Sequence, residues 1–196
     1  MRFSAASVVA CLLGTTSVIA GPLHDAARSG NTVLVAQLLD TGAAVSQPDD
    51  AGEPPLLIAA LAGKPEVVTL LLDKGSDIEI RNKGGLTALH AGAYGGNIEV
   101  VKLLVSRGAD VNDVKNFYHM SPLHAAAEEG HAEIVAFLIA NKADIEAKER
   151  NGYSPLTQAG WRSHWDAADL LLKAGATCQK AELVGDWLYS ECSKRQ

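Results

Sequence analysis

Residues 121–147 read SPLHAAAEEGHAEIVAFLIANKADIEA, and this stretch decides the fold. Ser121 is placed to cap the start of a helix, and Pro122 suits its first turn, where a missing N–H costs nothing. Gly130 suits the left-handed residue that ends this helix, and residues 132–140 then predict a second helix with one apolar stripe. Because two short helices cannot bury both apolar faces alone, the pattern predicts copies of the pair on either side.

The copies are present in the sequence. Leucines recur in steps of 33, 33, 34 and 33 residues, at Leu23, Leu56, Leu89, Leu123 and Leu156. The small or glycine position after the second helix recurs in the same steps, at Gly42, Gly75, Gly108, Lys142 and Gly175. The first helices begin with GPLH (21–24), PPLL (54–57), TALH (87–90), SPLH (121–124) and SPLT (154–157). This period predicts one elongated repeat array.

These motifs resemble those of the ankyrin-repeat family across residues 21–177, in about five copies. The resemblance implies an all-α repeat solenoid, in which each repeat is a helix-turn-helix unit with a β-hairpin loop that projects as a finger. It also implies that the first helices of the repeats line a concave face. Because a fold of this kind says little about its partner, function must be argued from the exposed side chains.

Residues 1–20 form a different kind of segment. Arg2 is its only charge, most other residues are apolar or small, and Val18-Ile19-Ala20 suits a signal peptidase. The segment predicts a cleaved secretory signal, with Gly21 as the new N-terminus and a periplasmic or secreted product. An uncleaved membrane anchor is the alternative, although the apolar run is shorter than the ~20 residues of a spanning helix. A lipoprotein signal before Cys11 is disfavoured because too few residues precede it.

Loss of this signal leaves 16 basic and 23 acidic side chains, a net charge near −7. An acidic surface argues against nucleic acid and anionic membranes as partners, since both are bound by positive charge. The mature chain keeps Cys178 and Cys192, which lie 14 positions apart. In an oxidising compartment these form either a disulfide, worth about 3 kcal/mol, or two free thiols. Residues 178–196 are predicted to be a C-terminal cap, with a helix over residues 180–192 that shields the last repeat.

The sequence offers little catalytic chemistry. His24, His90 and His124 occupy the fourth place of the helix-start motif, where the ring can hydrogen-bond the adjoining turn and tie neighbouring repeats together. One repeat separates these rings, which is too far for them to share a metal ion. No nucleophile elbow or phosphate-binding loop occurs, so we expect no enzyme activity, metal or cofactor. A hydrolase built from Glu128, His119 and neighbouring loops is the enzymatic alternative.

Two sets of side chains are not needed to hold the stack. One set lies between the alanines and the glycine of each first helix, and the other lies at the finger tips. Aromatic residues and arginine anchor protein interfaces. The two sets therefore predict a partner-binding ridge across repeats three to five, formed by Tyr94, Phe117, Tyr118, Tyr153, Trp161 and Arg162, above an acidic floor of Glu128 and Glu129.

The finger that opens repeat four, here called the fourth finger, carries two adjoining aromatics of this ridge. The step of 34 residues places one extra residue there, between Asp113 and Met120. In the alternative, Phe117 and Met120 pack onto the next repeat as core, and Trp161 packs against Trp165. We expect the ridge to bind a protein partner of a monomeric chain. That chain is either a scaffold or accessory factor, or an effector released to bind a host or competitor protein.

Overall fold

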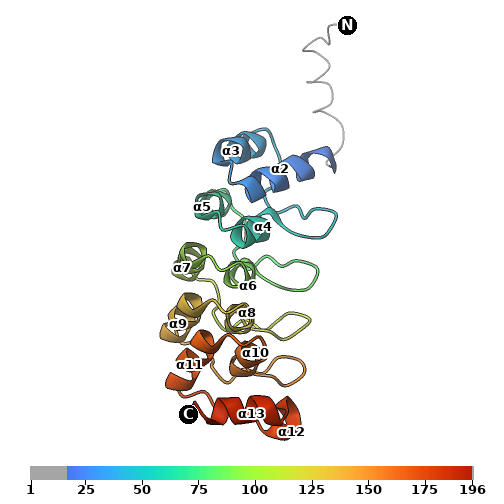
Figure 1. Ribbon diagram of the computed structural model, residues 1–196. Helices are drawn as coiled ribbons and strands as arrows, with labels where there is room; N and C mark the ends of the chain where they lie inside the picture. The colour runs from blue at the N-terminus through green and yellow to red at the C-terminus, as the bar shows by residue number, and fades with distance from the viewer. Residues whose placement is uncertain (1–16, 196) are drawn as a thin grey trace, which may run out of the picture.

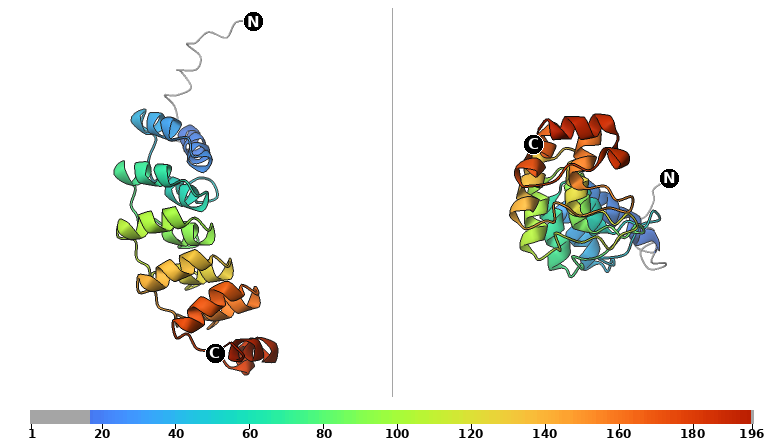
Figure 2. Two further views of the ribbon diagram at one scale, coloured as in Figure 1. Left: turned by 60° about the vertical axis from the view of Figure 1, so that its left-hand side comes forward. Right: turned by 90° about the horizontal axis from the view of Figure 1, so that it is seen from below.

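The computed structural model describes residues 17–195 of the chain. Within them, five pairs of helices stack one on another in two columns (Figures 1 and 2). The inner column consists of α2 (Ser17–Ser29), α4 (Pro55–Leu61), α6 (Ala88–Tyr94), α8 (Pro122–Glu128) and α10 (Pro155–Trp161). The outer column consists of α3 (Thr32–Asp40), α5 (Pro65–Asp73), α7 (Ile98–Ser106), α9 (Ala132–Ala140) and α11 (Trp165–Lys173). The predicted all-α solenoid is confirmed.

Helix boundaries follow the local signals of the sequence. Ser121 Oγ accepts a hydrogen bond from His124 N (3.3 Å), and Pro122 is the first residue of α8. Gly130 has a positive φ of 75°, so the chain reverses directly into α9. Lys142 and Ser163 stand where the other repeats have glycine, and both also adopt positive φ (66° and 60°). The repeated geometry therefore overrides the residue preference at these two positions.

The core is a row of identical positions along the stack. Leu56, Leu89 and Leu123 lie at the same place in successive inner helices and are buried, as are Leu23 and Leu156 at the two ends. Glycine allows the helices to approach closely, because a Cβ on Gly95, just after α6, would clash with the carbonyl oxygen of Leu61. Each repeat thus covers its neighbour, which agrees with the predicted dependence of each helix pair on the next.

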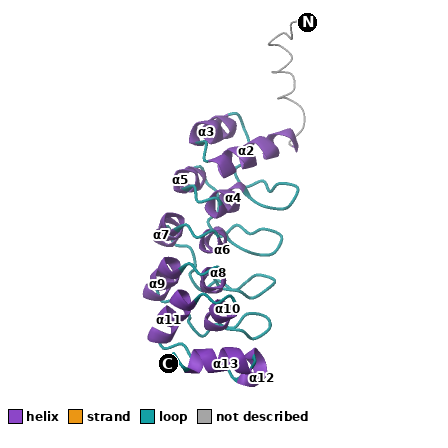
Figure 3. Cartoon of the chain, in the orientation of Figure 1, coloured by secondary structure: helices purple, strands orange, loops and turns teal. Residues whose placement is uncertain are grey.

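The fingers project from one side of the inner column and contain no strand among residues 17–195 (Figure 3). Three tips are closed by a backbone hydrogen bond such as Asn82 N to the oxygen of Leu86 (3.1 Å), and in repeat four Asn116 Nδ2 donates to the oxygen of Met120 (2.7 Å). Neighbouring fingers are joined by bonds such as Phe117 N to the oxygen of Gly84 (2.9 Å). The predicted hairpin loops are therefore found as projecting turns, and no paired strands form among residues 17–195.

The extra residue of the fourth finger lies before the tip. Leu86 N bonds Asn82 Oδ1, and Met120 N bonds Asn116 Oδ1 in the same way, so the two tips have the same length. The insertion therefore falls between Asp113 and Asn116. It lengthens the loop segment between α7 and the tip of this finger.

The C-terminal cap differs from the single helix predicted over residues 180–192. Two helices are found, α12 (Ala181–Val184) and α13 (Asp186–Ser193), separated by Gly185 at a φ of 88°. Glycine adopts this conformation without steric cost, so the chain turns here despite a helical apolar pattern. A disulfide joins Cys178 to Cys192 across a Cα–Cα distance of 5.9 Å.

The predicted leader lies outside the described residues except for Ser17–Ala20, the first turn of α2. In residues 17–195, none of the helices has both the length and the apolar character that crossing a membrane requires. Leader cleavage and the proposed domain boundaries stay predictions.

Replacing Ser76 with alanine is expected to raise the free energy of unfolding by about 1 kcal/mol. The Ser76 hydroxyl is buried and makes no hydrogen bond, whereas the other four repeats have alanine at this position (Ala43, Ala109, Ala143 and Ala176). Urea denaturation measures the change, with Ser46→Ala as the control for a serine that is not fully buried. A less stable Ser76→Ala protein would show that the hydroxyl has a partner after all.

Candidate protein-binding surface

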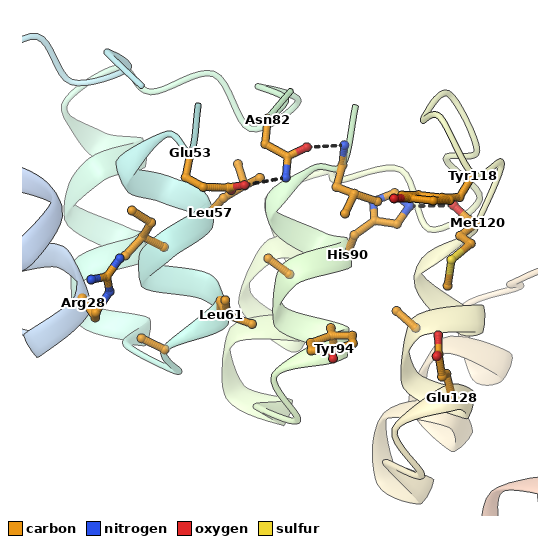
Figure 4. A pocket seen from close by; sticks show the side chains of 15 residues that line it. Arg28, Glu53, Leu57, Leu61, Asn82, His90, Tyr94, Tyr118, Met120 and Glu128 are labelled. Atoms are coloured by element: carbon orange, nitrogen blue, oxygen red, sulfur yellow. Dashed lines mark hydrogen bonds between the residues drawn. The ribbon is translucent and has the colours of Figure 1, made fainter. Parts of the chain in front are cut away.

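The inner helices and the fingers enclose an apolar groove of about 500 Å³ on the concave face (Figure 4). The lining residues come from repeats one to four: Arg28, Glu53, Leu57, Ile58, Leu61, Ala62, Asn82, Leu86, His90, Ala91, Tyr94, Tyr118, Met120, Ala125 and Glu128. Ten of these fifteen are apolar or aromatic, and the charged ones lie at the ends or on the finger wall. This volume is typical of a ligand or peptide site.

The groove contains large apolar side chains that the stack does not bury. Leu61 at the end of α4 and Tyr94 at the end of α6 are each 50% exposed. They occupy the same place in successive repeats, and Figure 4 shows them side by side along the groove. A contiguous apolar surface of this kind marks an interaction site more often than a solvated face.

The fourth finger contributes Tyr118 and Met120 to the finger wall of the groove. Tyr118 lines the groove, whereas Phe117 is not one of the lining residues and is 63% exposed. The two rings are edge to face at 5.2 Å, and the guanidinium of Arg150 lies 4.5 Å from the centre of the Phe117 ring. Phe117 is therefore not core. Met120 faces the groove and is only partly exposed.

The predicted ridge is divided in two. Tyr153 and Trp161 pack edge to face at 4.3 Å in repeat five, outside the groove. Between the two parts, Arg162 Nη2 donates to Glu128 Oε1 at 2.7 Å. This hydrogen bond and the charges of Glu128 and Glu129 raise the pKa of Arg162. The predicted acidic floor is thus partly neutralised by an arginine of the next repeat.

A family model described as ankyrin repeats (3 copies) matches residues 23–115 and again residues 112–182. Together the two matches cover most of the chain. The chain belongs to the ankyrin-repeat family. No curated protein matches it in sequence.

Ankyrin repeats are protein–protein interaction modules, so the exposed groove of this ankyrin-repeat chain is its first candidate for a partner site. In the described part of the chain, no cluster of three or more His, Cys, Asp or Glu side chains is arranged to hold a metal ion. Of the residues in the hydrolase alternative, Glu128 pairs with Arg162, and His119 is an exposed residue of the fourth finger.

The motif histidines link neighbouring ankyrin repeats. His124 Nδ1 accepts a hydrogen bond from Ser121 N (3.2 Å), so Nε2 carries the hydrogen and donates to the oxygen of Tyr153 in the next finger (3.1 Å). His90 makes the same bond to the oxygen of Met120 (2.9 Å). His24 is also buried, and its charge helps to lower the pKa of Asp49, after the larger effect of the backbone N–H of Glu53.

Acid is expected to destabilise this ankyrin stack through His124. Burial lowers the pKa of His124 from 6.5 to about 4, and it also lowers the pKa of His90. The unfolded chain therefore takes up the proton first, and stability present above pH 6.5 is lost as the pH falls toward 4. At pH 5 the loss from His124 is about 2 kcal/mol.

The measurement is urea unfolding at pH 7.5 and pH 5.0, above the range in which most carboxylates titrate. His124→Gln keeps a capping side chain at this helix position and does not titrate. It should therefore lose less stability between the two pH values than the unmodified chain. Equal losses in the two proteins would mean that His124 does not titrate in this window.

Of the side chains predicted from the sequence to bind a partner, Tyr94, Tyr118 and Glu128 line the groove. Part of the groove floor was not predicted. Leu57 and Ile58 line the groove, and their side chains are almost fully buried beneath it. The sequence signal for this floor is Leu57, which replaces the motif histidine of the second repeat. A leucine cannot hydrogen-bond the next finger as histidine does, so the groove is apolar at this position.

Proposed function

We propose that this ankyrin-repeat chain is exported after loss of residues 1–20 and binds another protein in its concave groove, without catalysing a reaction. It acts as a scaffold or accessory factor for that partner. The main support is the exposure of Leu61 and Tyr94 in adjacent repeats, at positions where a polar residue would serve the stack equally well. Removing such a surface from water favours association.

The geometry of α2 supports processing after Ala20. In α4, α8 and α10 the motif proline is the first helical residue, whereas Pro22 lies inside α2 when the leader is attached. A proline inside a helix removes a backbone hydrogen bond, while the first position tolerates it. Cleavage would give α2 the same start as the other inner helices, and it would leave Leu23 as the first buried side chain.

The Cys178–Cys192 disulfide also supports export, because disulfides persist in oxidising compartments. Cell fractionation with mass measurement of the mature chain tests this step. We expect a chain that begins at Gly21, in the periplasm for an accessory factor or in the medium for an effector. A full-length chain retained in a membrane would contradict export by cleavage.

Partner binding is tested by affinity capture with residues 21–196 as bait, followed by titration of the captured protein. Leu61→Ala and Tyr94→Ala should each weaken binding by about tenfold or more, the effect of losing a well-packed interface anchor. The melting temperature should hardly change, because both side chains are half exposed.

The matched controls are Leu183→Ala and Tyr189→Ala. Both side chains are 43% exposed, and they lie on the cap rather than in the groove. These variants should bind as the unmodified chain does. If the cap variants weaken binding and the groove variants do not, the partner site lies at the C-terminal end of the array.

A further inference from the structure

The ends of the inner helices form a line of five equivalent positions, one in each repeat. These positions, here called the rungs, are Arg28, Leu61, Tyr94, Glu128 and Trp161. The first four line the groove, and Figure 4 shows them in sequence along its length. Their chemistry changes from cationic to aliphatic, aromatic and anionic, so the two ends of the groove differ.

The spacing of the rungs suits one kind of partner backbone. Packed helices lie about 8–10 Å apart, and the close contact at Gly95 shows that the inner helices are in direct contact. Residues seven apart in an α-helix lie on one face and are separated by about 10.5 Å. Same-face residues of a strand are separated by about 6.7 Å, so a strand cannot match successive rungs.

The charges of the groove leave one group without a partner. The Arg28 side chain is exposed, and none of the described residues forms an ion pair or hydrogen bond with its guanidinium. Glu128, at the other end, is already paired with Arg162 at 2.7 Å. Glu53, on the finger wall, accepts a hydrogen bond from Asn82 Nδ2 at 2.9 Å. A bound segment is therefore most favourable with a carboxylate at the Arg28 end and apolar groups at the next two rungs.

We propose that the groove docks an amphipathic helix of another protein, with a carboxylate on Arg28 and apolar side chains seven and fourteen residues along, over Leu61 and Tyr94. This proposal rests on the proposed function of the groove and adds the form of the bound segment and the end at which it carries its charge. The unpaired guanidinium places the acidic end of the helix at repeat one.

Two display libraries of 22-residue peptides test the proposal, with residues 21–196 as the target. One library has a helical Ala/Glu/Lys/Gln framework with random residues at positions 1, 8 and 15, and the other has the alternating pattern of a strand. We expect binders from the helical library with Asp or Glu at one end position and large apolar residues at the other two. Selection on Arg28→Glu should change the acidic residue to Lys or Arg and leave the apolar pair.

A selected acidic peptide should bind Arg28→Glu about fivefold to tenfold more weakly than the unmodified chain, as expected for reversing one charge of an exposed pair. Lys173→Glu makes the same charge change on the outer helix α11 and should leave the affinity unchanged. The Leu61→Ala chain should bind every selected helix more weakly.

The outcomes separate this proposal from the proposed function. Strand-type binders that need Leu61 and Tyr94, or helical binders indifferent to Arg28→Glu, would overturn the helix proposal while groove binding stands. Binders unaffected by Leu61→Ala, or no binders from either library, would overturn both. A dimer of the isolated chain that Leu61→Glu converts to monomer would make a second copy of the chain the occupant, and it would also overturn the helix proposal.

Discussion

Arg81→Ala is expected to lower the free energy of unfolding by about 3 kcal/mol, because it leaves a buried carboxylate without its cation. Arg81 Nη1 donates to Asp113 Oδ2 at 2.6 Å, and the Asp113 side chain is only 1% exposed. Burial acts to raise the pKa of Asp113, but the hydrogen bonds from Arg81 and from Lys115 N more than offset this, so the pKa lies below its usual value. The carboxylate therefore depends on Arg81 to remain charged inside the stack.

Arg107→Ala is the matched control. Arg107 Nη1 also bonds an aspartate of a neighbouring repeat, Asp73 Oδ1 at 2.9 Å, but both side chains are exposed. An exposed pair contributes less than about 1 kcal/mol. Urea denaturation compares the two variants, and Asp113→Asn in the Arg81→Ala background should recover part of the loss by removing the buried charge. Equal, small losses of unfolding free energy in the two arginine variants would show that the burial of Asp113 does not increase the contribution of the Arg81 pair.

The helix framework was predictable because its signals are local. Ser121, Gly130 and residues 132–140 specify a cap, a stop and an apolar stripe within a few positions, and the structure has the second helix at those bounds. The 33-residue period then requires neighbours that cover each pair. The helix framework can therefore be predicted without knowing any contact between side chains that are distant in the sequence.

The site was only partly predictable because it depends on such contacts. The ridge is interrupted where Arg162 reaches back 34 residues to Glu128, and Tyr153 packs on Trp161 instead of lining the groove. Arg81 and Asp113 likewise meet across 32 positions. The break at Gly185 was missed for a different reason: one glycine in an apolar pattern is compatible with either a continuous helix or a turn.

Reduction of the Cys178–Cys192 disulfide is expected to destabilise the C-terminal end of the array by about 3 kcal/mol. The reason is that the unfolded chain gains conformational entropy once the bond no longer closes a loop of this length. The bond holds the cap against the last repeat, where Leu188 of α13 fills the space above Gly160 of α10. Gln179, next to Cys178, donates to the oxygen of Gly152 (2.8 Å) and accepts from Ser154 N (2.8 Å). These contacts replace those of a further finger.

The three tryptophans make this loss measurable in one part of the molecule. Trp161, Trp165 and Trp187 all lie in the last repeat or the cap, whereas far-UV circular dichroism reports on every helix. Because a repeat array is stabilised by nearest-neighbour contacts, opening the cap should weaken the adjacent repeat first. With reductant, the tryptophan fluorescence transition should therefore move to lower urea and precede the circular dichroism transition.

The double variant Cys178→Ser/Cys192→Ser should show the same separated transitions with or without reductant. If reductant has no effect on the double variant, the effect belongs to this bond, since both cysteines of residues 21–196 are replaced. If the two probes instead give one coincident transition that reductant does not move, the cap is held by packing alone. In that case Leu188 and Gln179 are sufficient to close the end of the stack, and the disulfide adds nothing to its stability.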